Sequence, residues 1–226
     1  MTNTRTRILG HACELFMHAG FGGFSMRCLA RRVGVTAPAL YRHFANREEV
    51  LFEVFQEAFD ELFRRLTRAL AGATPLERFE MAGDAYMDFA LDHPRYFQML
   101  HSFRQLAGLD RTPAKLRRRH AAIRQFWTDR VRECTEAGIF RPESHERIML
   151  TLWSHAYGLL SLYTMRTMGE MPREVFRREY RASRRRILAG VGVEGIGAML
   201  PAPEGGPGEE AEAGAAPEGR ELPWHS

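Results

Sequence analysis

The sequence predicts an all-α fold, and three features support this prediction. Apolar residues recur at positions i, i+3, i+4 and i+7 along most of the chain, which is the spacing of one helix face. No segment alternates apolar and polar residues as a half-buried strand does, and Gly or Pro ends the periodic segments at helical intervals. We expect about nine helices, arranged as an N-terminal three-helix domain and a larger C-terminal helical domain.

The first two predicted helices have recognisable ends. Residues 8–19 carry apolar side chains at helical spacing, and Gly20 ends that helix. Ser25 is a good N-cap for a second, short helix, and Gly34 ends it because glycine readily adopts a positive φ.

The third and fourth helices follow directly. Thr36 caps the third, with Pro38 in its first turn, where a missing N–H costs little. Asn46 and Glu49 resemble a capping box at the start of a long fourth helix, which continues to about residue 70.

Five further helices are predicted beyond residue 72, over roughly 75–93, 96–103, 113–137, 145–168 and 173–189. From about Gly192 the chain is rich in Gly, Pro, Ala and Glu, with almost no large apolar residue to bury. We expect a disordered acidic tail there. The predicted domains are therefore 1–47, 48–190 and the tail 191–226.

The net charge of +4 conceals opposite charges at the two ends of the chain. Residues 1–47 hold seven arginines against one acid, Glu14, whereas residues 191–226 hold seven glutamates against Arg220. A basic segment attracts a polyanion, because neutralised phosphates release condensed counterions. The N-terminal charge thus favours a nucleic-acid partner.

Composition excludes several classes of protein. Three widely spaced cysteines do not suggest a disulfide framework, and they favour a reducing cytoplasm. We expect them to be packing thiols, with a redox-sensing role as the alternative. No run of 18 apolar residues predicts a membrane span, and the N-terminus lacks the apolar run of a secretory signal.

The segment 25–44, SMRCLARRVGVTAPALYRHF, has the parts of a helix-turn-helix. Two short helices meet at a glycine-containing turn, and the second turns Leu40 and Phe44 toward the core. The other face of that helix exposes Ala37, Pro38, Tyr41, Arg42 and His43, which suits the major groove of DNA. The alternative is a three-helix module that contacts protein, but the charge of the same residues favours DNA.

Residues 7–55 resemble the N-terminal domain of the TetR/AcrR (tetracycline-repressor) family of regulators. The likeness lies in the ELF of the first helix, the Gly-Phe turn, LA..VGV, ALYRHF and the NREEV start of the fourth helix. WSHAYGLLSLY (153–163) is similar to a W-x-x-x-H-G segment of one subgroup, although here the His is residue 155 and the Gly residue 158.

The resemblance implies roles for particular residues. Ser25 would contact phosphate, Arg27 would reach a guanine, and Arg47 would hold phosphate at a helix N-terminus. The residues matching operator-contacting positions of the recognition helix are Thr36, Ala37, Pro38, Tyr41 and His43. Because alanines occupy 37 and 39 where some members have polar residues, DNA shape and methyl contacts would carry more of the specificity.

The resemblance also implies a homodimer, formed by the last two helices and bound to a palindromic operator. Residues 148–163 carry two apolar stripes, which suits a helix packed between its own domain and a second subunit. A buried central helix in a monomer is the alternative. The last helix carries seven arginines, at positions 173, 177, 178, 181, 184, 185 and 186. We interpret them as a solvated face that the acidic tail screens. A second contact with DNA is the alternative.

Family members usually bind a small molecule in the larger domain, so we expect an apolar or aromatic effector. The candidate ligand-binding residues are Phe89, Phe97, His101, Trp127, Trp153, His155 and Tyr157. The histidines show no metal-type spacing, and no nucleophile–base pair or phosphate loop is recognisable, so we predict no metal, no cofactor and no enzyme activity. The prediction is a repressor released by its effector. A regulator controlled by a protein partner or by its abundance is the alternative, and an enzyme or carrier is a third.

Overall fold

The computed structural model describes residues 4–103 and 112–200. Within these residues the chain forms ten α-helices and one 3₁₀ turn, which confirms the predicted all-α fold. The chain divides into two compact units, Met1–Arg130 and Val131–Ser226. Each is described separately below.

The first three helices are α1 (Thr4–Gly23), α2 (Met26–Val33) and α3 (Ala37–Tyr41). Helix α1 is interrupted at Gly20, whose φ of 63° and ψ of −173° are not helical, and this agrees with the predicted helix end. Apolar side chains from α1, α2, α3 and the segment after α3 are buried together, among them Ile8, Leu29, Leu40 and Phe44. This core fixes the angle at which α2 and α3 meet.

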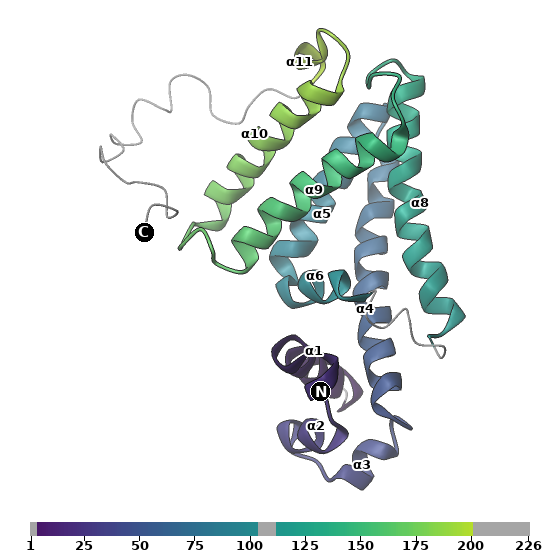
Figure 1. The fold of residues 1–226 in the computed structure, drawn as a ribbon, viewed down its shortest axis with the longest axis vertical. Helices are drawn as coiled ribbons and strands as arrows, with labels where there is room; N and C mark the ends of the chain where they lie inside the picture. Colours follow the sequence, from purple (N-terminus) through teal and green to yellow (C-terminus); the bar gives the residue numbers. More distant parts are fainter. Residues whose placement is uncertain (1–3, 104–111, 201–226) are drawn as a thin grey trace. The chain divides into compact units, whose positions relative to one another are not determined.

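The rest of the first unit is built around the long helix α4 (Arg47–Arg68) and the 3₁₀ turn η1 (Ala69–Ala71). Helices α5 (Pro75–Asp92) and α6 (Pro94–His101) pack against α4, and α6 also packs against α1. Helix α8 (Ala114–Glu136) leads from the first unit into the second (Figure 1).

Aromatic rings join the core of the first three helices to that of α4. The ring centroids of Phe16 and Phe55 are 5.8 Å apart, and those of Phe55 and Phe103 are 5.4 Å apart. Phe59 meets Phe103 edge to face at 5.1 Å. A single apolar core therefore connects α1 with α4 and with Phe103, which follows α6. Because such a core is closely packed, a shift of one element displaces the others.

The second unit contains α9 (His145–Thr164), α10 (Arg173–Val191) and α11 (Ile196–Met199). Helices α9 and α10 run in opposite directions and pack side by side (Figure 1), and Tyr163 of α9 stacks on Phe176 of α10 with ring centroids 4.0 Å apart. No helix in the described part of the chain is long and apolar enough to cross a membrane.

Residues 192–200, which composition assigned to the disordered tail, are ordered. The backbone N–H of Val193 donates to the carbonyl of Ile139 at 3.0 Å, and Ile196 and Leu200 are buried. Two apolar residues are enough to hold this short segment on the unit, a contact that composition alone did not reveal. Residues 201–226 lie outside the described residues, so the boundary and state of the tail stay a prediction.

Candidate nucleic-acid interface

Helix α2 begins and ends where the sequence predicted. The Ser25 hydroxyl accepts a hydrogen bond from the backbone N–H of Cys28 at 3.2 Å, which satisfies one of the free donors of the first turn. At the other end Gly34 has a φ of 78°, and its N–H donates to the carbonyl of Ala30. Leu29 and Val33 are buried, so Arg27 on the opposite side of the helix is exposed.

Helix α3 is short, and a side-chain cap and a proline define its start. The Thr36 hydroxyl accepts from the N–H of Ala39 at 3.3 Å, and Pro38 occupies the first turn. Leu40 is completely buried beneath the helix, whereas Tyr41 keeps 52% of its surface exposed. The helix therefore presents one face to the core and the other to solvent, as a recognition helix does.

The structure exposes most of the residues predicted to contact DNA. The exposed residues are Ser25, Arg27, Thr36, Pro38, Tyr41, Arg42 and His43, while Ala37 and Arg47 are half-buried. Helices α2 and α3 pack against each other, so these residues belong to one small module. Their roles toward DNA remain a proposal.

Arg47 is held more firmly than the sequence indicated. Its guanidinium lies over the ring of Phe21 at 4.5 Å, donates to the carbonyl of Phe24 at 3.4 Å and pairs with Glu48 at 3.0 Å. Directly before it, the Asn46 side chain accepts from the N–H of Glu49 at 2.8 Å, which confirms the predicted cap of α4. Arg47 thus adds positive charge at the start of α4 and also ties that start to the end of α1.

Two N-terminal arginines have structural roles that the sequence did not reveal. The Arg5 guanidinium pairs with Glu53 of α4, lies 4.6 Å from the ring centre of Phe44 and donates to the carbonyl of His43. Arg7 donates to the carbonyl of Val33, the last residue of α2, at 3.1 Å. They support the ends of α3 and α2 respectively, through contacts too distant in sequence for local patterns to predict.

A cluster of aromatic side chains lies between α5, α6 and α8 in the first unit. Phe97 and His101 are on α6 with ring centroids 4.9 Å apart, and Trp127 of α8 meets Tyr86 of α5 at 6.1 Å. The Tyr86 hydroxyl and His101 Nε2 are 3.4 Å apart. Because burial lowers the pKa of His101 to about 4, this imidazole is neutral near pH 7 and can either donate or accept a hydrogen bond.

The predicted ligand-binding residues fall into separate groups. The structure brings Phe97, His101 and Trp127 into the aromatic cluster. Phe89 is fully buried and packs on His93, with ring centroids 5.8 Å apart. The remaining three, Trp153, His155 and Tyr157, lie on α9 in the second unit, where Trp153 and Tyr157 stack at 5.7 Å.

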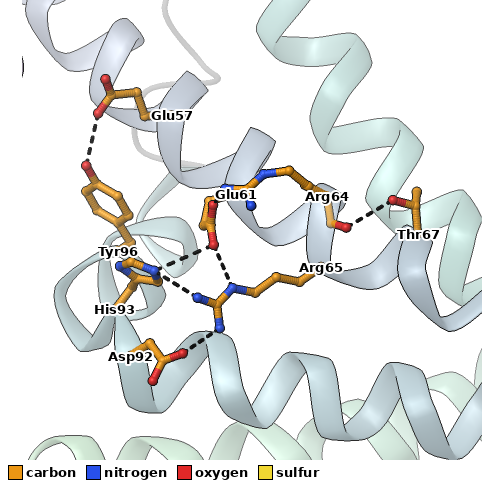
Figure 2. Close-up of polar contacts among 8 residues, drawn as sticks. All are labelled: Glu57, Glu61, Arg64, Arg65, Thr67, Asp92, His93 and Tyr96. Carbon is orange, nitrogen blue, oxygen red and sulfur yellow. Dashed lines mark hydrogen bonds and ion pairs between the residues drawn. The ribbon is translucent and has the colours of Figure 1, made fainter.

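Polar contacts fix the start of α6 against α4 and α1. Figure 2 shows Arg65 of α4 between Glu61, Asp92 and His93, with distances of 2.6, 2.7 and 3.1 Å. The Tyr96 hydroxyl donates to Glu57 of α4 at 3.0 Å (Figure 2).

The neighbouring Arg95 pairs with Glu14 of α1 at 2.5 Å. Helix α6 is therefore bonded on one side to α4 and on the other to the helix that supports α2 and α3.

Two family models match the chain in successive segments. The model described as "Bacterial regulatory proteins, tetR family" matches residues 8–54, and "Tetracyclin repressor-like, C-terminal domain" matches residues 79–182. The chain belongs to the TetR family of transcriptional regulators. Residues 8–54 include α2, α3 and their caps, so the family's helix-turn-helix DNA-binding module is the surface described above.

The chain is similar to other members of this family over most of its length. The transcriptional regulator UidR of Escherichia coli K12 is 26% identical over 171 residues, which cover 70% of this chain and 80% of UidR. The transcriptional repressor KstR2 of Mycobacterium tuberculosis is 26% identical over 146 residues, covering 63% and 72%. The solved structure of that ketosteroid regulator matches the fold with a TM-score of 0.73 at 23% identity, over 86% of this chain and 97% of KstR2.

The family and these relatives are transcription regulators rather than enzymes. Within residues 4–103 and 112–200, no three His, Cys, Asp or Glu side chains gather as a metal site would require. The three cysteines are free thiols; Cys13 and Cys134 are buried, and burial raises the pKa of Cys13 to about 12. A buried thiol of this kind is protonated at neutral pH and therefore a poor nucleophile.

Proposed function

We propose that this chain is a repressor that binds a palindromic operator as a homodimer and leaves it when a small apolar or aromatic effector binds. One observation carries the DNA-binding part of this proposal. Helices α2 and α3 are each capped by a side chain and buried on one face, and they present Arg27, Thr36 and Tyr41 to solvent. Because this helix pair is already ordered, it can enter the major groove without a further loss of conformational entropy at its recognition residues.

The exposed residues suit two kinds of contact. Arg27 has the fork geometry that reads O6 and N7 of guanine, so it would carry most of the hydrogen-bond specificity. Thr36 and Pro38 at the start of α3 are short, which lets the backbone approach base edges and thymine methyls. Ser25 and Arg47, at the starts of α2 and α4, would hold phosphates.

A titration with single substitutions tests these assignments. Arg27→Ala should weaken binding to the operator by about tenfold or more while changing binding to random DNA less, because the base pair contributes about 1–3 kcal/mol of discrimination. Arg47→Ala should weaken binding to both DNAs alike. Arg118→Ala, at an exposed position of α8, is the matched control for loss of one positive charge. Equal losses on both DNAs for Arg27→Ala would contradict its assignment.

The dimer is supported by the surface of α9. Leu150 and Trp153 keep 63% and 45% of their surface exposed, although both are large and apolar. Exposed apolar residues gathered along one helix mark an interaction surface. Two copies of α9 related by a twofold axis would cover them, and the same axis would place two recognition helices on the two halves of a palindrome.

An effector response is supported by the position of α6. The aromatic cluster includes Phe97 and His101, and the same short helix is bonded to α1 through the Arg95–Glu14 pair. A ligand inserted among these rings would displace α6, and α1 would follow. Such a ligand shifts the population away from the DNA-binding arrangement only if it binds that arrangement more weakly.

The alternative is control by a protein partner or by abundance. Screening apolar and aromatic compounds by melting temperature separates the two proposals, since a ligand that binds only the folded chain raises its stability. A compound that raises the melting temperature and lowers operator affinity supports the effector. If the operator affinity of this chain falls only when a second protein is added, the alternative is supported.

A further inference from the structure

The recognition helix α3 is too short to fix its own direction. It has five residues, Ala37–Tyr41, whereas isolated helices need about 12–15 residues to be stable in water. Leu40 is buried beneath it, but the residues that lead from α3 to α4, Arg42 and His43 among them, are exposed. The angle of α3 therefore depends on what holds its C-terminal end.

Arg5, in the first turn of α1, reaches this end of α3. Its Nη1 donates to the carbonyl of His43 at 3.5 Å, and the guanidinium lies 4.6 Å from the ring centre of the buried Phe44. Its Nε donates to Oε2 of Glu53 on α4 at 3.0 Å, and its Nη2 donates to Oε1 of the same carboxylate. Two parallel bonds of this kind fix the orientation of both groups.

One guanidinium therefore joins the start of α1, the end of α3 and the second turn of α4. All three of its nitrogens are engaged and Glu53 compensates its charge, so Arg5 is poorly placed to bind a phosphate. We propose that Arg5 and Glu53 form a positioning clamp, which sets the angle of the recognition helix against α4 without contacting DNA. This proposal rests on the operator binding proposed above.

The clamp predicts that loss of an acidic residue weakens DNA binding. On charge alone, removing a carboxylate strengthens binding to a polyanion. Glu53→Gln breaks the paired bonds, because an amide has one acceptor oxygen and turns its NH₂ toward a second donor. We expect operator affinity to fall about fivefold at a temperature where all variants are folded, which is the upper end of what a partly exposed ion pair contributes.

The matched control is Glu57→Gln, one turn further along α4. It removes the same charge, and its amide oxygen can still accept a hydrogen bond from the Tyr96 hydroxyl. Operator affinity should stay the same or rise in this variant, because no contact with α3 is lost.

Substitutions of Arg5 separate positioning from phosphate binding. A lost phosphate contact lowers the slope of log affinity against log salt concentration by about 0.9, whereas a lost clamp leaves the slope unchanged. Arg5→Gln should weaken operator binding about fivefold at unchanged slope. Arg5→Lys keeps the charge but lacks the planar fork, so it should lose nearly as much. Combining Arg5→Gln with Glu53→Gln should weaken binding no further than either substitution alone.

Hydrogen exchange in the free chain tests the clamp without DNA. The backbone N–H groups of residues 42–44 donate to carbonyls within α3. In Glu53→Gln these amides should exchange at least about threefold faster, and in Glu57→Gln they should exchange as in the unmodified chain. If the unmodified chain bound no operator, the proposed function would fail, and the exchange rates would still decide whether the clamp exists.

Three results would overturn the proposal. An operator affinity that rises in Glu53→Gln would mean that only the charge of this residue matters. A salt slope that falls in Arg5→Gln but not in Arg5→Lys would assign Arg5 to a phosphate. Unchanged exchange of residues 42–44 in Glu53→Gln would show that the end of α3 is held without the pair.

Discussion

The pH dependence of stability should report the burial of His101. Burial lowers its pKa from 6.5 to about 4 in the folded chain, whereas the unfolded chain leaves the imidazole in water. Between these two values the unfolded state binds a proton that the folded state does not. Stability from this group is therefore constant above about pH 6.5 and falls as the pH drops from 6.5 toward 4.

The size of the effect follows from the shift. Between about pH 7.5 and pH 5, the difference in proton binding lowers the free energy of unfolding by about 2 kcal/mol. His101→Gln removes the titration while keeping a group that can hydrogen-bond to Tyr86, so this variant should lose about 2 kcal/mol less over the same range. Its absolute stability at pH 7.5 is a separate matter, since repacking around Phe97 and Tyr86 also contributes.

Urea denaturation at a series of pH values measures the difference. The variant, the unmodified chain and His18→Gln, which removes an imidazole from an exposed position of α1, are compared at each pH. Burial also lowers the pKa of His93, His120 and His155, but these groups are common to all three proteins and cancel in the comparison. If the free energy of unfolding had the same pH dependence in His101→Gln and in the unmodified chain, the interpretation of His101 as a buried, neutral imidazole would be refuted.

Further predictions concern the helix ends, the core and the dimer. Gly34→Ala forces a side chain into a φ of 78°, so urea denaturation should show a loss of about 1 kcal/mol, and an unchanged midpoint would contradict the left-handed cap. Leu40→Ala removes the fully buried anchor of α3 and should lower the free energy of unfolding by about 3 kcal/mol. Operator binding should be lost in a gel-shift assay at temperatures where the rest of the chain is folded. Full retention of binding would count against the anchor role. Leu150→Glu, on the exposed apolar side of α9, should convert a dimer to a monomer in sedimentation equilibrium, and a dimer of unchanged affinity would exclude this surface.

Local sequence signals predicted the local structure well. Ser25, Thr36 and Asn46 were each expected to cap a helix, and each accepts the backbone N–H expected of a cap. These interactions join residues three positions apart, so the amino-acid types at fixed offsets are sufficient to identify them. The same applies to Gly34, whose lack of a side chain predicts its positive φ.

Contacts between distant residues were not predictable in this way. Arg5 and Arg7 contribute to the positive charge of residues 1–47, yet they pair with Glu53 and with the carbonyl of Val33, which are 48 and 26 residues away. The candidate ligand residues likewise share an apolar or aromatic character, which cannot distinguish the cluster around Phe97 from the surface of α9 that carries Trp153. Only the packing of helices separates them.

Selection of bound DNA from a random pool by the full-length chain tests the central claim most directly. A capped α2–α3 module on a twofold dimer predicts enrichment of an inverted repeat whose half-sites are about one helical turn apart. Arg27→Ala, taken through the same selection, should enrich a repeat in which one guanine position per half-site is no longer fixed. A pool that stays random after repeated rounds, or that yields a single half-site without its inverted partner, would contradict the account.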